Sequence, residues 1–216
     1  MLNDVSFLQE GQTLRTQGLL RHGQAELRVV VPEPQQMGAH REILEYIIRY
    51  LETTGARITP GQTFVLGFWL LRLEAAADGV LDLWEVDEKW QTFRPGIATA
   101  FSFWCTQLDV CHQFQARFSP PLADNLVVVS EGVLEGVRPV EGVRYPSKSP
   151  MSGWWLTTDL YDGNVESLRT VHAHHLCESL RELAWFFALP FGYRFRLTAE
   201  GEDVWFDEGV AAQEPA

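Results

Sequence analysis

The chain has 216 residues, of which 46% are hydrophobic, and a formal net charge of −12 at pH 7. A chain of this length buries roughly 70% of its unfolded surface, so it can form its own core without disulfides or metals. The negative charge argues against sequence-independent binding to nucleic acid or to an anionic membrane, because those surfaces are also negative. It favours a basic partner instead.

Cysteine content and the first residues bear on the compartment. Cys105, Cys111 and Cys177 show no CxxC spacing, so neither a disulfide framework nor a zinc knuckle is indicated. The start of the chain lacks a basic segment followed by an apolar one, and no run approaches the ~18 apolar residues that a membrane-spanning helix needs. We therefore expect a cytoplasmic protein in a reducing compartment, with no membrane association.

The beginning of the chain predicts one strand and one helix. Residues 1–23 contain glycines that interrupt any periodic pattern, so we expect a short helix or an irregular arm. Residues 26–31 predict a strand that ends at Pro32. Apolar residues at helical spacing over residues 39–53, followed by Gly55, predict a helix.

The next segments predict a hairpin and a long helix. Residues 63–73 are nearly all apolar, which is typical of a strand buried on both faces. Residues 80–86 would pair with that strand across a turn. Residues 97–118 carry large apolar side chains at helical spacing and predict a long helix that ends before Pro120-Pro121.

The predicted elements divide the chain into three segments. We expect an N-terminal α+β domain over residues 1–120, a C-terminal α+β domain over residues 124–208, and a flexible tail over residues 209–216. The predicted fold class is α+β, with antiparallel or mixed sheets and packed helices in two small subdomains. The proline pair marks the boundary between the two domains.

The C-terminal part predicts strands at residues 126–130 and 154–158, separated by a loop rich in Pro and Gly that runs to Pro150. Residues 159–164 read as a loop in which Asn164 can cap a helix.

A helix is expected to follow Asn164, because five large apolar residues up to Phe187 share one helical face. Ser179 and Glu182 match a capping box, which would divide this helix in two. Residues 193–207 predict a closing hairpin.

A histidine cluster offers a metal hypothesis. His172 and His175 lie three residues apart, and His174 and Cys177 lie beside them, as imidazole and thiolate ligands of zinc would require. Only His172 and His175 point together on a helix, so the first shell is incomplete and ordinary packing or surface roles are favoured. We expect no metal and no cofactor.

Catalytic alternatives are weak by the same reasoning. Cys105 and His112 would need an orienting acid and an oxyanion donor, and neither is evident. Asp159, Asp162 and Glu166 could be paired acids of a hydrolase, but acids at this position also cap a following helix and complement its dipole. The protein is therefore expected not to be an enzyme.

Three short motifs carry a resemblance to a known family. Val129-Ser130, Val133-Leu134-Glu135-Gly136 and Ser152-Gly153-Trp154 stand in the order and approximate spacing of a VS…VLEG…SGW pattern. The pattern resembles that of a bacterial immunity-protein family, the one numbered thirty-three among polymorphic-toxin immunity proteins, and the likeness covers residues 124–208. Residues 44–67 are weakly similar to suppressor-of-fused-like domains, which also occur as immunity modules.

Both resemblances imply an immunity protein that binds and neutralises a cognate bacterial toxin by occlusion. The alternatives are a small hydrolase or metal-dependent enzyme that uses the His172/His175 region, and a cytosolic interaction module without a toxin partner. The predicted partner surface is the loop after residue 158, with Tyr161 as an aromatic anchor and Asp159, Asp162 and Glu166 as steering charges.

Overall fold

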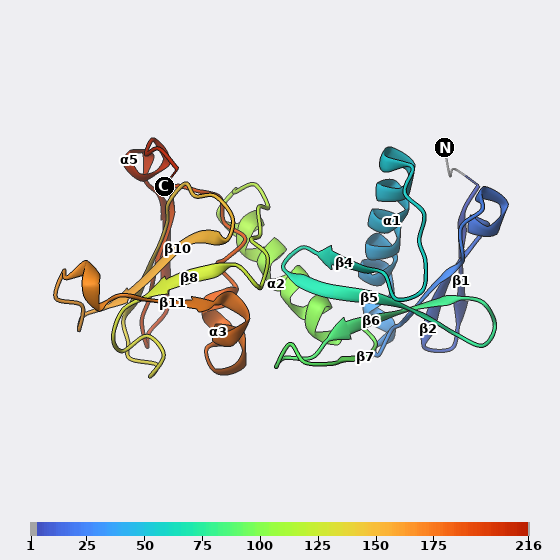
Figure 1. Cartoon of the computed structure of the whole chain (residues 1–216), viewed down its shortest axis with the longest axis horizontal. Coiled ribbons are helices and arrows are strands. Elements are labelled where there is room, and N and C mark those ends of the chain that lie inside the picture. Colours follow the sequence, from blue (N-terminus) through green and yellow to red (C-terminus); the bar gives the residue numbers. More distant parts are fainter. Residues whose placement is uncertain (1–3, 216) are drawn as a thin grey trace. The chain divides into compact units, whose positions relative to one another are not determined.

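The structure of the protein is a computed structural model that describes residues 4–215 (Figure 1). The chain divides into two compact units. The first comprises the residues up to Asp87 together with Gln91–Ser102, and the second comprises Glu88–Trp90 together with the residues from Phe103 onward. Each unit contains a sheet that mixes antiparallel pairs with a parallel pair. This arrangement confirms the predicted α+β class.

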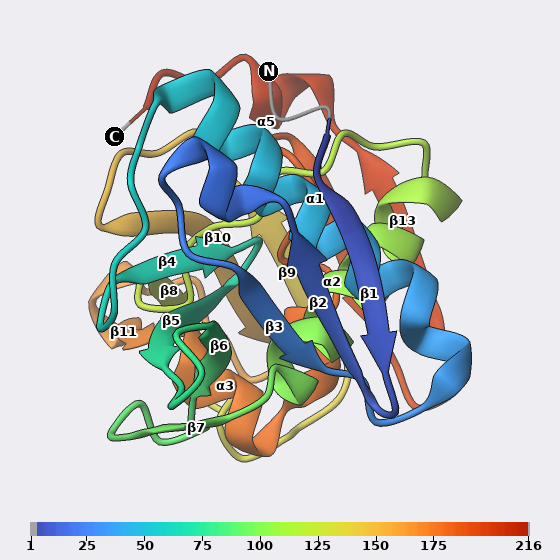
Figure 2. The ribbon, with the colours of Figure 1, turned by 90° about the vertical axis from the view of Figure 1, so that its right-hand side faces the viewer.

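The sheet of the first unit has the strand order β1-β2-β3-β6-β5-β4, with β7 paired to β6 (Figure 2). Its neighbours are antiparallel except β3 and β6, which run parallel with Leu27 beside Leu81. The strands are β1 Ser6–Glu10, β2 Thr13–Gln17, β3 Leu27–Val30, β4 Thr63–Leu66, β5 Trp69–Ala75, β6 Leu81–Val86 and β7 Phe93–Pro95.

Helix α1 spans Met37–Thr54 and confirms the helix predicted over residues 39–53. A short 3₁₀ helix, η2 Pro34–Gln36, leads into it. The Gly55 N–H donates to the Leu51 carbonyl at 3.0 Å with Gly55 at φ +65°, the left-handed ending that a glycine tolerates best. The buried side chains that form its apolar stripe are Ile43, Leu44, Ile47, Ile48 and Leu51.

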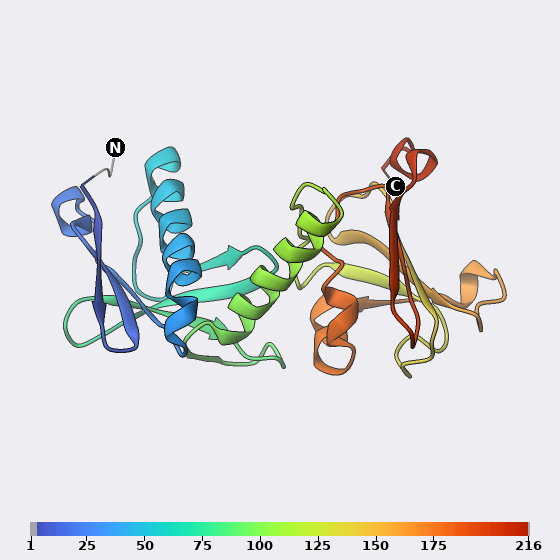
Figure 3. The same cartoon turned by 180° about the vertical axis from the view of Figure 1, so that it is seen from behind.

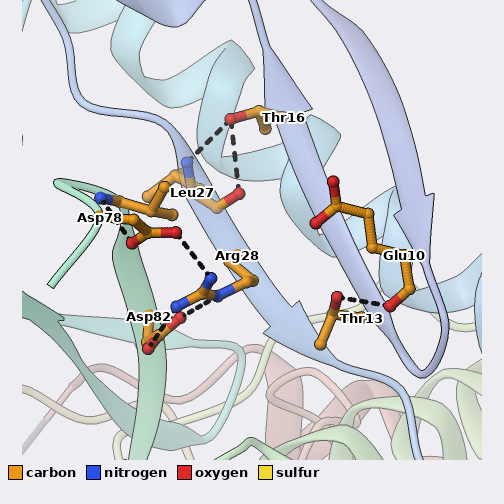
Figure 4. Close-up of polar contacts among 8 residues, drawn as sticks. Glu10, Thr13, Thr16, Leu27, Arg28, Asp78 and Asp82 are labelled. Atoms are coloured by element: carbon orange, nitrogen blue, oxygen red, sulfur yellow. Dashed lines mark hydrogen bonds and ion pairs between the residues drawn. The ribbon is translucent and has the colours of Figure 1, made fainter. Parts of the chain in front are cut away.

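Polar side chains connect β2, β3 and β6 (Figure 4). The Arg28 guanidinium donates to Asp82, with Nε 2.6 Å from Oδ1, and to Asp78, with Nη1 2.9 Å from Oδ2. The Thr16 hydroxyl accepts a hydrogen bond from the Leu27 N–H at 2.8 Å. These contacts reinforce the parallel β3–β6 pair and its antiparallel neighbour.

The expectation of a short helix or irregular arm at the start of the chain is wrong for β1 and β2, which form a hairpin. Residues 1–3 lie outside the described part. Gly11 takes φ +60° in the turn, and the Thr13 hydroxyl donates to the Glu10 carbonyl at 2.8 Å (Figure 4). A glycine that interrupts a helical pattern here makes a hairpin turn. A 3₁₀ helix, η1 Leu19–His22, follows.

The single strand expected over residues 63–73 is two strands. Gly67 adopts φ +57° between β4 and β5, and Leu66 lies opposite Trp69 in the ladder. The chain therefore reverses inside the apolar run, which hydrophobicity alone cannot reveal. The predicted pairing with residues 80–86 is confirmed, because β5 pairs antiparallel with β6.

The sheet of the second unit, drawn in yellow-green to red in Figure 3, contains six strands in the order β11-β8-β10-β9-β12-β13. β8 and β10 run parallel, and the other neighbours are antiparallel. The predicted strands at residues 126–130 and 154–158 and the closing hairpin are confirmed. The strands are β8 Leu126–Val129, β9 Val140–Arg144, β10 Met151–Thr158, β11 Arg169–His172, β12 Tyr193–Leu197 and β13 Glu202–Phe206.

Helix α2 spans Ala98–Gln113, within the predicted residues 97–118, and the division between the two units falls inside it. The remaining helices are the 3₁₀ helix η3 Val165–Ser167, α3 Ala173–Ser179, α4 Arg181–Ala184 and α5 Glu208–Ala211. The core of the second unit is aromatic, since Trp154 and Phe195 are fully buried with ring centroids 5.4 Å apart.

The loop expected between residues 130 and 150 contains an interior strand, so that expectation is wrong for β9. The strand pairs with both β10 and β12. A Cβ on Gly142 would lie 2.1 Å from the Phe195 ring, so the glycine is required for close packing rather than for a loop.

The helix expected directly after Asn164 is also wrong. The chain forms η3 and then β11, which pairs with β8, before α3 begins. The predicted break is present at Leu180, but in the described residues no side chain caps α4. Glu182 pairs with Arg138 instead of closing a capping box. Pairing with an exposed strand edge overrides the helical spacing of the leucines.

Part of the expected tail is ordered as α5. The Asp207 carboxylate accepts from the Val210 N–H at 3.1 Å, and Val210 is 6% exposed. The cap and the buried valine hold these residues in a helix.

Candidate interaction surface

The predicted loop after β10 is fastened to the turn after β8. The Thr158 hydroxyl donates to the Glu131 carbonyl at 2.7 Å and accepts from the Leu160 N–H at 3.3 Å. The Thr158 carbonyl accepts from the Tyr161 N–H at 3.0 Å. Both loops therefore share one hydrogen-bonded base, which limits their movement.

The four predicted partner-binding residues lie on this loop and on η3. Asp159, Asp162 and Glu166 are exposed, and Tyr161 is half-buried. In the described part of the chain, none of the three carboxylates takes part in an ion pair. They are therefore available to a cationic partner.

The alternative role of the acids, capping the following helix, falls to Asn164. The Asp162 Oδ1 accepts from the Asn164 N–H at 2.9 Å, and the Asn164 Oδ1 accepts from the Glu166 N–H at 3.0 Å. Asn164 thus caps η3, as its sequence position predicted. One carboxylate oxygen of Asp162 is used in this turn.

The motif residues build the frame of this surface. The Ser130 hydroxyl accepts from the Thr158 N–H at 3.1 Å, joining the end of β8 to the end of β10. The Ser152 hydroxyl donates to the Leu126 carbonyl at 2.8 Å at the start of the same two strands. A Cβ on Gly153, which has φ +85°, would lie 2.3 Å from the Tyr145 carbonyl oxygen. Trp154 fills the core.

A groove lies between the turn after β8 and the η3–β11 segment. Its volume is about 450 Å³. Side chains of both signs and two leucines line it: Glu131, Leu134, Glu135, Glu166, Leu168 and Arg169. Sequence reasoning named Glu166 but not Glu131, Leu134 or Glu135, although the latter two belong to the VLEG motif. The signal in the sequence was an apolar residue, Leu134, beside the acids Glu131 and Glu135 in a predicted loop.

The histidine cluster lies at the start of α3. The His172 Nδ1 is 2.6 Å from the Asp124 carbonyl oxygen, and the His174 Nδ1 is 3.1 Å from the Ala123 carbonyl oxygen. Burial lowers the pKa of His174 below its ordinary value. Across residues 4–215, no group of three His, Cys, Asp or Glu side chains is arranged to hold a metal ion.

Two cysteines are buried in the second unit. Burial raises the pKa of the Cys111 thiol to about 11 and raises that of the Cys177 thiol well above its ordinary range. Both are therefore thiols at neutral pH, which does not suit a nucleophile.

The second unit is thus an α+β domain with an aromatic core and an exposed acidic loop after β10. Residues 106–207 match the family model of the Imm33-like domain, so this part of the chain is similar to an immunity-protein family. The match confirms the resemblance found in the motifs and begins earlier, inside α2. No curated protein and no solved structure gives a match. Within the described residues, no helix combines the length and apolar content needed to cross a membrane.

Proposed function

We infer that the protein acts in the cytoplasm as an immunity protein, which binds a cognate bacterial toxin and blocks it by occlusion. The observation that supports this function most directly is the Imm33-like domain over residues 106–207. The exposed acidic loop after β10 is the surface that we propose for toxin binding.

The mechanism is steric and electrostatic. Acidic groups speed encounter with a basic surface and fix its orientation, while affinity comes mainly from a few desolvated anchors. Tyr161 supplies the aromatic side chain, and Asp159, Asp162 and Glu166 supply unpaired charge around it. Because the loop is already fastened to the turn after β8, little ordering is needed on binding.

The test is a double variant, Tyr161→Ala with Asp162→Asn. Asparagine keeps an oxygen for the Asn164 N–H, so the turn should persist while the charge is removed. We expect binding to weaken by at least ~2 kcal/mol, since an anchor and a charge are lost together. The measurement is calorimetric titration with purified toxic domains of polymorphic toxins, beginning with any that is encoded next to this protein's gene, together with protection of cells that express the domain that binds.

A matched control is Tyr50→Ala with Asp109→Asn, two exposed residues that belong to helices α1 and α2 and not to this loop. It should bind and protect like the parent. If the Tyr161/Asp162 variant is folded and binds as tightly as the parent, the loop is not the interface. If the parent itself neither binds nor protects, the immunity function is wrong.

A further inference from the structure

Exposed apolar side chains lie on the two chain segments that supply the lining of the groove beside η3. Leu134 is 41% exposed, Leu160 is 53% exposed and Val165 is 66% exposed. All three lie in the turn after β8 or in the segment between β10 and β11, the two chain segments that frame the groove. Large apolar side chains gathered on one surface of a folded domain are typical of a protein-binding site.

The framing turn is packed closely enough to keep its shape. Gly132 has φ +84°, and a Cβ there would lie 2.9 Å from the Thr158 Oγ1 and 3.0 Å from the Leu160 Cδ1. Val133 beside it is fully buried. Leu134 and Glu135 are therefore held outward by a turn that is fixed from below, which lowers the entropic cost of binding.

The charges of the groove select the partner. Glu131, Glu135 and Glu166 line it, and Arg169 is the one cation among its described lining residues. None of the three glutamates takes part in an ion pair in the described part of the chain. Carboxylates spaced around a concave surface complement guanidinium groups, which can bind them through two parallel hydrogen bonds.

We propose that this groove binds a basic segment of the toxin, in which an arginine enters between the glutamates and a neighbouring apolar side chain packs on Leu134 and Leu168. The proposal rests on the immunity function and adds to it the chemistry of the partner and the side of the loop that it contacts. It predicts that residues of the VLEG turn contribute to affinity, and not only Tyr161 and Asp162.

The test is the triple variant Glu131→Gln, Glu135→Gln and Glu166→Gln. Glutamine keeps the size and polarity of each side chain and removes its charge, so the fold is retained, as thermal unfolding will verify. We expect affinity for the toxic domain that the parent binds to fall about 30-fold, and the salt dependence of the association rate to become shallower. Leu134→Ala should weaken binding about tenfold, mainly through faster dissociation.

The matched control is Glu178→Gln, Glu208→Gln and Glu214→Gln, which changes the net charge equally. Strand register places α3 and α5 beyond the opposite end of the sheet, because His172 pairs with Leu126 and Phe206 pairs with Tyr193. This control should bind within about threefold of the parent, since only long-range attraction is reduced.

Equal affinities of the two triple variants would overturn the groove as the site, while a parent that binds normally would leave the immunity function in place. If the parent does not bind the toxic domain, both the groove as the site and the immunity function are wrong. The comparison therefore separates a wrong site from a wrong function.

Discussion

Arg144 is a buried cation held by carbonyl oxygens. The residue is 4% exposed. Its guanidinium donates to four backbone carbonyls, those of Ser119, Ser152, Phe187 and Leu189. Burial lowers its pKa to about 9, so the side chain is still charged at neutral pH. Arg144 therefore joins β9, an interior strand of the sheet, to the segment that carries Phe187 and Leu189.

Arg144→Met should lower the free energy of unfolding by about 3 kcal/mol, because several buried carbonyls lose their donor. The measurement is urea unfolding. Arg196→Met is the control: Arg196 is 44% exposed and pairs with Glu141 at 3.5 Å, so its loss should cost less than about 1 kcal/mol. Equal losses would show that the carbonyl cluster does not depend on the guanidinium.

At the residue scale, local chemistry was predictable and non-local neighbours were not. Asn164 was expected to cap the next turn and does so, because a cap depends on residues two or three positions away. Glu131 and Glu135 could not be placed near Glu166, because that proximity arises from β8 pairing with both β10 and β11.

Helix α3 begins among three imidazoles. The ring centroids of His174 and His175 are 4.3 Å apart, and those of His172 and His174 are 5.3 Å apart. Asp124 is the nearby carboxylate that opposes the effect of burial on the pKa of His174. A helix N-terminus also disfavours positive charge, so acidification should weaken this element.

The direction in which stability changes with pH follows from the lowered pKa of His174. Below its unfolded value of 6.5 the unfolded chain binds a proton that the folded chain binds less readily, so stability present above that pH is lost as pH falls. We expect the urea midpoint to drop between pH 8 and pH 5. His174→Asn, which retains a donor for the Ala123 carbonyl, should reduce that drop. The exposed His112→Asn should leave it unchanged, and an equal pH response of both variants would contradict this role.

Elements with a strong local pattern were predicted well. The stripe of α1 and the Val-rich β8 needed no tertiary information. β9 and β11 were missed for a physical reason, since each is defined by the strands that it pairs with and not by a pattern of its own. Gly142 weakens the local signal of β9, yet Phe195 requires it.

For the whole molecule, the proposed division near Pro120-Pro121 stays a prediction. Arg117 and Lys148 are exposed, and both lie outside helices and strands. Brief digestion with trypsin should therefore cut after Arg117 or Lys148 before it cuts inside the core of either unit, as mass spectrometry of the fragments will identify. First cleavage after Arg72, inside β5, would contradict the division.

The insertion of β8 between β10 and β11 also has a consequence for the newly made chain. The β9–β10 and β12–β13 pairs join neighbouring segments and can form early, whereas the β8–β10 pair joins strands separated by β9. The acidic turn after β8 meets the loop after β10 only once this distant pairing has closed. We therefore expect the frame of the proposed interaction surface to form after the β9–β10 hairpin in each new copy of the chain.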